Sequence, residues 1–138
     1  MSHLESDLAA KARGVRVLVV DDTAHLREVV ADMLRLDGFD VVGAADSGAA
    51  ALELAASTDP HVVVMDLKMP GMDGLEATRR LRALRPEQQV VLYTAYLDAT
   101  IEREAHEAGA ALCLTKLEGL PRLERELVRM TLAVARPD

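Results

Sequence analysis

The run Val62-Val63-Val64-Met65 is apolar at every position, and Val17-Leu18-Val19-Val20 near the N-terminus has the same character. A strand that packs on one face alternates apolar and polar residues, whereas an unbroken apolar run is typical of a strand buried on both faces. Sheets covered on both faces are usually parallel, with helices in the crossovers. The two runs therefore predict a parallel sheet between two layers of helices.

Short apolar segments alternate with helix-like segments five times along the 138 residues. The predicted strands are residues 15–20, 41–44, 62–65, 90–93 and 111–114. The predicted helices are a segment between Thr23 and Gly38, then residues 49–56, 74–84, 99–108 and 120–135. Five such units in a chain of this length predict one doubly wound α/β domain. We expect that domain over residues 14–136, preceded by an N-terminal extension of residues 1–13.

The first predicted helix carries its apolar residues at helical spacing. Leu26, Val29, Val30, Met33 and Leu34 recur at i, i+3, i+4, i+7 and i+8. This spacing predicts that the five residues share one face of a helix. The side chain of Thr23 is a candidate N-cap for this helix.

Composition restricts the function classes. The net charge of −7 argues against nucleic acid or an anionic membrane surface as a partner, since phosphate contacts require a basic face. Cys113 is the only cysteine, which suits a reducing compartment. The chain has neither a signal-peptide pattern nor an apolar run long enough to span a bilayer. We therefore expect a soluble, cytoplasmic protein.

Polar residues follow four of the predicted strands. Asp21 and Asp22 come directly after the first strand, Asp66 after the third, Thr94 after the fourth and Lys116 just beyond the fifth. The carboxyl ends of parallel strands share one edge of the sheet, which is where such folds bind ligands. The sequence therefore predicts that these five side chains lie close together.

This set of residues suits a metal ion and a phosphoryl group. Three converging carboxylates repel one another unless a cation joins them, and hard oxygen ligands favour Mg²⁺. An ammonium and a hydroxyl beside that metal can donate to phosphoryl oxygens. Asp21, Asp22 and Asp66 are thus candidate metal ligands, with Lys116 and Thr94 as candidate phosphoryl contacts.

The pattern resembles a known family, the receiver domains of two-component response regulators, over residues 14–135. The motifs that carry the resemblance are Val-Asp-Asp at 20–22, Met-Asp-Leu-Lys-Met-Pro-Gly-Met-Asp-Gly at 65–74, Thr-Ala at 94–95, and Gly-Ala at 109–110 leading to Lys116. The resemblance implies a flavodoxin-like sheet of order 2-1-3-4-5 with five helices.

The resemblance also implies roles for individual residues. Asp66 would accept a phosphoryl group from a phosphohistidine of a sensor histidine kinase or a histidine phosphotransfer protein. Asp22, Asp66 and the backbone carbonyl of Lys68 would bind Mg²⁺, with Asp21 acting mainly through water. Thr94 and Lys116 would contact the acyl phosphate and draw their loops toward it.

The expected activity is limited to self-phosphorylation and autodephosphorylation, so we expect a signalling protein rather than an enzyme. Because the sequence ends at Asp138, it resembles chemotaxis-type single-domain regulators. The output would then be a protein target on the face formed by residues 99–108, 111–114 and 120–135. In receivers, the positions of Lys68 and Tyr96 flank the phosphoryl group, and we hypothesise that Tyr96 shields it from water.

Two positions depart from the family pattern. Receivers usually carry an aromatic residue three positions before the lysine, where this chain has Cys113, and a proline after it, where this chain has Leu117. The Lys116–Leu117 bond is expected to be trans, since a cis bond before a residue other than proline costs about 3–4 kcal/mol. These departures leave open a degenerate receiver that acts as a phosphorylation-independent docking module.

Two other classes fit less well. Phosphatases of the haloacid dehalogenase type carry an Asp-x-Asp-x-Thr motif, which Asp21-Asp22-Thr23 does not match. A nucleotide or flavin binder would be expected to have a glycine-rich loop after the first strand, where this chain has none.

Overall fold

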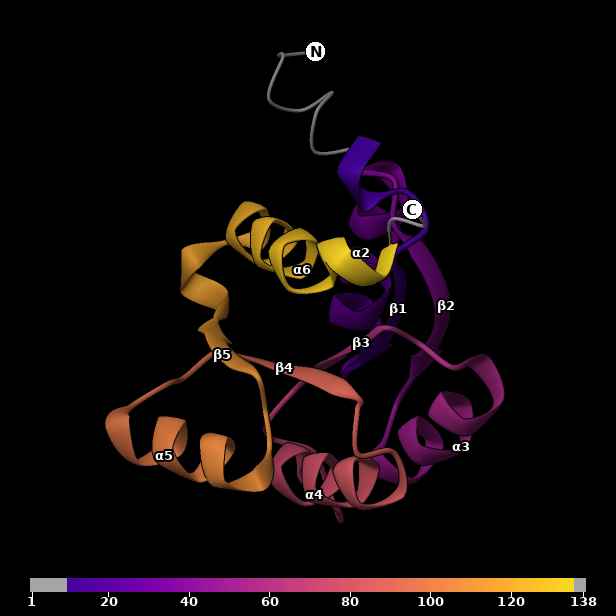
Figure 1. Ribbon diagram of the computed structural model, residues 1–138. Helices are drawn as coiled ribbons and strands as arrows, with labels where there is room; N and C mark the ends of the chain where they lie inside the picture. Colours follow the sequence, from indigo (N-terminus) through magenta and orange to yellow (C-terminus); the bar gives the residue numbers. More distant parts are fainter. Residues whose placement is uncertain (1–9, 136–138) are drawn as a thin grey trace.

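The computed structural model describes the backbone of residues 10–135 and the side chains of residues 10–131. A parallel sheet of five strands runs through the centre in the order β2-β1-β3-β4-β5 (Figure 1). The strands are β1 (Arg16–Val20), β2 (Asp40–Ala45), β3 (Val62–Met65), β4 (Gln89–Thr94) and β5 (Leu112–Thr115). The predicted doubly wound fold and its strand order are confirmed.

Helices connect the strands. They are α2 (Ala24–Leu36), α3 (Gly48–Thr58), α4 (Gly74–Leu84), α5 (Ala99–Ala108) and α6 (Leu120–Ala135), with a 3₁₀ turn, η1 (Lys116–Glu118), before α6. Residues 10–12 form a further helical turn. None of the described helices is both long and apolar enough to cross a membrane. The predicted extension lies mostly outside the described residues, but Ala12 is fully buried in the core.

The sheet separates two hydrophobic cores, and Figure 1 shows α2 and α6 on one face and α3, α4 and α5 on the other. Strand residues alternate between the cores, so that Leu92 packs toward α3–α5 and Tyr93 toward α2 and α6. The continuous apolar runs of β1 and β3 follow from this arrangement, because both faces of each strand are covered.

The apolar stripe predicted for α2 is divided between the core, where Leu34 and Val30 pack, and the solvent. Ala31 and Leu34 are buried, whereas Leu26, Val29 and Met33 are 42%, 43% and 40% exposed. Ala31, which lies outside the predicted stripe, is buried together with Leu34 of the stripe, so the buried side of α2 only partly coincides with the stripe.

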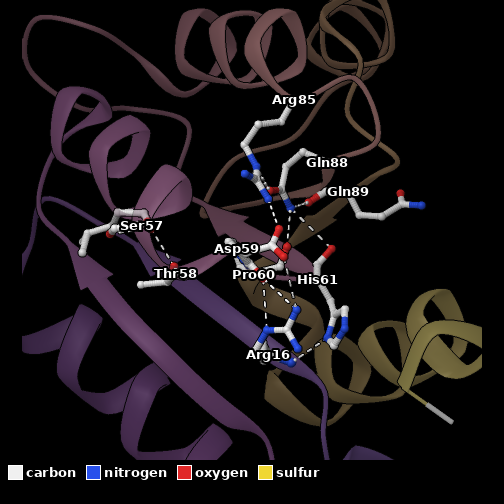
Figure 2. Close-up of polar contacts among 10 residues, drawn as sticks. Arg16, Ser57, Thr58, Asp59, Pro60, His61, Arg85, Gln88 and Gln89 are labelled. Carbon is white, nitrogen blue, oxygen red and sulfur yellow. Dashed lines mark hydrogen bonds and ion pairs between the residues drawn. The ribbon is translucent and has the colours of Figure 1, made fainter. Parts of the chain in front are cut away.

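A polar network ties the strands together at their amino ends, on the edge opposite the predicted site (Figure 2). The Arg16 side chain donates to the carbonyl oxygen of Asp59 at 3.0 and 2.9 Å, and the Asp59 carboxylate pairs with Arg85. The backbone N–H of Arg16 donates to Nδ1 of His61 at 2.9 Å. Gln88, which is 4% exposed, donates to the His61 carbonyl oxygen. This edge is held by satisfied hydrogen bonds and paired charges.

Glu124 is the unusual buried group on α6. It is 4% exposed, and its Oε2 atom has no hydrogen-bond partner among the described residues. Burial and, after it, the neighbouring Asp37 at the end of α2 together raise the pKa of Glu124 to about 8. Glu124 therefore holds a proton at neutral pH in the folded protein.

This burial predicts a pH-dependent stability. Because the pKa of Glu124 is higher in the folded than in the unfolded chain, its favourable contribution is complete below the unfolded value of 4.5 and is lost as the pH rises through about 8. Glu124→Gln keeps the shape without the ionisation, so its stability relative to the parent should increase from about pH 5 to about pH 9. Urea unfolding at several pH values measures this difference. A difference that stays constant with pH would contradict the assignment.

Candidate functional site

The five predicted site residues all lie at the carboxyl edge of the sheet. Asp21 and Asp22 directly follow β1, Asp66 follows β3, Thr94 ends β4 and Lys116 follows β5. Backbone hydrogen bonds continue past the strand ends and hold two of them. The Asp66 N–H donates to the Val20 carbonyl oxygen at 2.9 Å, and the Asp21 N–H donates to that of Ala45 at 3.0 Å.

Lys116 joins the acidic side chains. Its Nζ atom lies 3.1 Å from Oδ2 of Asp21 and 3.5 Å from Oδ1 of Asp66. Asp21, Asp22 and Asp66 each place a carboxylate oxygen within 4.8 Å of the others. Three carboxylates thus face one ammonium, and the group has an excess of negative charge.

The loop after β3 folds tightly around Asp66. Its Oδ1 atom accepts the Leu67 N–H at 3.0 Å, and the Gly74 N–H donates to the Leu67 carbonyl oxygen at 2.7 Å. A Cβ atom at residue 74 would lie 2.2 Å from the Asp66 carbonyl oxygen, so only glycine fits there. The Asp73 side chain caps α4 by accepting the Glu76 N–H. The start of α4 therefore fixes the backbone that carries Asp66.

Asp21 is held by further contacts. Its Oδ1 atom accepts the Thr23 N–H at 2.9 Å, and its carbonyl oxygen accepts Nη1 of Arg27 at 2.8 Å. Thr23 occupies the N-cap position of α2 as predicted, but its side chain makes no capping hydrogen bond. With Lys116 on Oδ2, both oxygens of this 4%-exposed carboxylate have protein partners.

The environment of Asp66 works against its ionisation. Partial burial raises the pKa of the Asp66 carboxyl above its usual value, and the negative charges of Asp21 and Asp22 raise it further. Lys116 and the Leu67 N–H lower this pKa but do not fully compensate. A cation at this position would favour the ionised form.

The donor set fits a hard divalent cation. Carboxylate oxygens are the ligands of Mg²⁺, which keeps several waters and takes one or two carboxylates. Asp22 is exposed and can be reached by a hydrated ion, whereas Asp21 is buried against Lys116. Asp22 and Asp66 are therefore better placed than Asp21 to bind such an ion directly.

The side chains of Thr94 and Lys68 do not pair directly with the carboxylates of Asp21, Asp22 and Asp66. Thr94 is 3% exposed, and its Oγ1 atom lies 3.4 Å from the Tyr96 N–H, which donates to it. Lys68 lies in the loop between Asp66 and α4, with its side chain exposed. Among the described residues, neither side chain forms a hydrogen bond or an ion pair with the three carboxylates.

Comparison with known families agrees with this arrangement. The family model for the response regulator receiver domain matches residues 17–128. The chain belongs to this receiver domain family. The resemblance predicted from the sequence motifs is thereby confirmed.

Curated relatives of this receiver domain are longer proteins. The chain is similar to response regulator GacA of Pseudomonas viridiflava, with 46% identity over 107 residues that cover 77% of this chain and 50% of that protein. It is also similar to the protein-glutamate methylesterase/protein-glutamine glutaminase of Haloarcula marismortui, with 39% identity over 134 residues that cover 92% of this chain and 36% of that protein. The chain spans about half the length of the GacA relatives that it matches.

Solved receiver domains share the fold. A two-component response regulator of the LuxR family from Aurantimonas sp. SI85-9A1 matches with a TM-score of 0.77 and 33% identity, over 88% of this chain and 86% of that chain. The response regulator domain of Thermotoga maritima CheB matches with a TM-score of 0.68 and 34% identity, over 90% and 95%.

The two departures of this receiver domain lie close to Lys116. Cys113 is partly buried among the residues that face α3–α5, and burial, together with the charge of Glu102, raises the pKa of its thiol to about 11. Cys113 is therefore a neutral thiol at physiological pH. Leu117 is 88% exposed, and the Lys116–Leu117 bond is trans, as predicted.

Two neighbours of the site were not foreseen. Arg27 anchors the Asp21 carbonyl oxygen, and the Tyr93 ring lies 5.9 Å from the Lys116 ammonium. The helical spacing places Arg27 one turn into α2, which could have indicated a position near β1. Because β4 is apolar along its length, its sequence does not indicate on which face of the sheet the Tyr93 ring lies.

Proposed function

We propose that this receiver domain is a phosphorylation-controlled binding module whose Asp66 accepts a phosphoryl group in a Mg²⁺-dependent reaction. The donor would be the phosphohistidine of a sensor histidine kinase or a histidine phosphotransfer protein. The observation that supports this most strongly is the Lys116 ammonium between Asp21 and Asp66, with Asp22 completing an acidic group open to solvent.

The proposed reaction is a transfer between two side chains. An oxygen of Asp66 forms a bond to phosphorus while the P–N bond of the phosphohistidine breaks, and the electron pair of that bond returns to the imidazole nitrogen. Oδ1 of Asp66 is engaged by the Leu67 N–H and lies near Lys116, which leaves Oδ2 as the attacking oxygen. Asp22, Asp66 and the Lys68 carbonyl oxygen would hold Mg²⁺, which when bound would neutralise charge on the transferred oxygens.

Lys116 and Thr94 would hold the product. Lys116 already lies within reach of Asp66, and the Thr94 hydroxyl can turn from the Tyr96 N–H toward a phosphoryl oxygen. The acyl phosphate carries about two negative charges at pH 7, where the Asp66 carboxylate carries one, and it offers three acceptor oxygens. This change would alter the loops that carry Thr94 and Lys116.

We infer that the output is a changed contact with a protein partner on the face formed by α5, β5 and α6. The loops that carry Thr94 and Lys116 lead directly into α5 and α6. The negative net charge makes nucleic acid and anionic membranes poor partners, and a cytoplasmic location fits a kinase as donor. The chain's own chemistry would be limited to gain and loss of the phosphoryl group.

Incubation with acetyl phosphate and Mg²⁺, followed by intact-mass measurement, tests the acceptor assignment. We expect the mass gain of one phosphoryl group in the parent and none in Asp66→Asn. Asp73→Asn is the matched control, because it changes a carboxylate in the same loop and asparagine still caps a helix. Absence of the adduct, or its survival in Asp66→Asn, would contradict the proposal and favour a phosphorylation-independent docking module.

Tyr96 provides a test of how the phosphoryl group is protected. Its side chain is 61% exposed, two residues beyond Thr94, and is free to cover the site. Tyr96→Ala should speed loss of the phosphoryl group severalfold by admitting water, whereas Tyr96→Phe keeps the bulk and should match the parent. The decay of the phosphorylated mass after removal of the donor measures both rates. Equal rates in all three proteins would refute shielding.

A further inference from the structure

Lys116 contacts more than the acidic cluster. Its ammonium lies over the ring of Tyr93, 5.9 Å from the ring centroid, while its other contacts are the carboxylates of Asp21 and Asp66. An ammonium within about 6 Å of an aromatic face is attracted by the ring quadrupole. The one lysine of the site is therefore shared between the carboxylates and an aromatic ring.

Tyr93 shares a hydrophobic core with α6. It is 6% exposed and belongs to the hydrophobic core that contains Leu123 and Leu127 of α6. Burial raises the pKa of the Tyr93 hydroxyl, Lys116 lowers it, and Glu124 of α6 raises it, so the side chain is neutral at pH 7. Because the ring and α6 share a core, a displacement of the ring changes packing next to α6.

Cys113 does not supply an aromatic ring next to the site. Cys113 stands where receivers usually carry the aromatic residue, and it packs toward α3–α5, on the opposite face of the sheet from Tyr93. Tyr93 lies on the neighbouring strand, paired with Leu114. Of the two tyrosines, Tyr93 is buried in the core that includes α6 residues, and Tyr96 is exposed.

We propose that Tyr93 is a positioning residue that holds the Lys116 ammonium in the resting state and couples its movement to α6. This rests on the proposed phosphorylation of Asp66. The added negative charge draws the ammonium toward the phosphoryl oxygens and away from the ring. The ring, relieved of its cation, then repacks against Leu123 and the segment of α6 that carries Glu124.

The test uses the small number of lysines. Protein labelled with ¹³C-lysine gives side-chain NMR signals for Lys11, Lys68 and Lys116 alone, which single Lys→Arg variants assign. We expect the resting Lys116 signal to show a ring-current shift and nuclear Overhauser contacts to the Tyr93 ring. Tyr93→Phe should keep the shift and Tyr93→Leu should lose it, while the Lys68 signal stays unchanged in both.

The Lys116–Tyr93 contact in the unphosphorylated parent tests the claim that Tyr93 holds Lys116, even if Tyr93→Leu fails to fold. A parent Lys116 signal without contact to the Tyr93 ring, or the same shift in a folded Tyr93→Leu, would overturn it.

Phosphorylation of the protein tests whether movement of Lys116 is coupled to α6. Once intact mass shows the phosphoryl group on the parent, the Lys116–Tyr93 contact should weaken and the Glu124 amide signal should shift. In Tyr93→Leu, phosphorylated to the same extent, that shift should be largely lost, and Tyr93→Phe should restore it. An unchanged contact in the phosphorylated parent would refute the coupling. A parent that takes up no phosphoryl group would instead refute the acceptor role of Asp66, while the resting contact still decides whether Tyr93 positions Lys116.

Discussion

The contact of the Lys116 ammonium with the carboxylates of Asp21 and Asp66 is possible only because three parallel strands end at the same edge of the sheet. The same geometry crowds Asp22 into the group. Two unit negative charges about 5 Å apart repel by about 3 kcal/mol at an effective dielectric constant of 20. One ammonium beside three carboxylates leaves the group with an excess of negative charge. The fold therefore holds a charge imbalance at this edge that a divalent cation can relieve.

The two edges of the sheet differ in how their polar groups are satisfied. At the amino edge, Arg16 and Arg85 are paired with Asp59, and Gln88 donates to backbone carbonyl oxygens (Figure 2). At the carboxyl edge, the negative charge exceeds the positive charge. Burial raises the pKa of Asp66, and the neighbouring carboxylates add to this effect. The hydrogen bonds at the amino ends of the strands, and the burial of the strands on both faces, keep the carboxyl ends in place despite the repulsion between their carboxylates.

Much of this arrangement could be predicted from the sequence. Continuous apolar runs indicate the strands, and their ends determine where Asp66 and Lys116 lie, because parallel strands present their carboxyl ends together. The bounds of α4, α5 and α6 were predicted correctly, since proline, glycine and capping residues mark their ends.

The features that could not be predicted from the sequence are those that depend on the direction of a side chain. Helix α2 has apolar residues on two adjoining stripes, so periodicity alone could not choose the Ala31 side over the Met33 side. Strand β4 is apolar through Tyr93, so alternation could not show that this ring lies beside Lys116, in the core shared with α6. Both are decided by packing between elements that are distant in the sequence.

We infer that the carboxyl edge binds a divalent cation through its excess of carboxylates. The most direct test is to measure the thermal midpoint of unfolding as a function of Mg²⁺ concentration. A ligand that binds only the folded state stabilises it increasingly with concentration. We expect Mg²⁺ to raise the midpoint of the parent and of Asp40→Asn, an exposed carboxylate at the amino end of β2, but to leave that of Asp22→Asn nearly unchanged. A parent midpoint that does not respond to Mg²⁺, or an equal response in Asp22→Asn, would contradict the account.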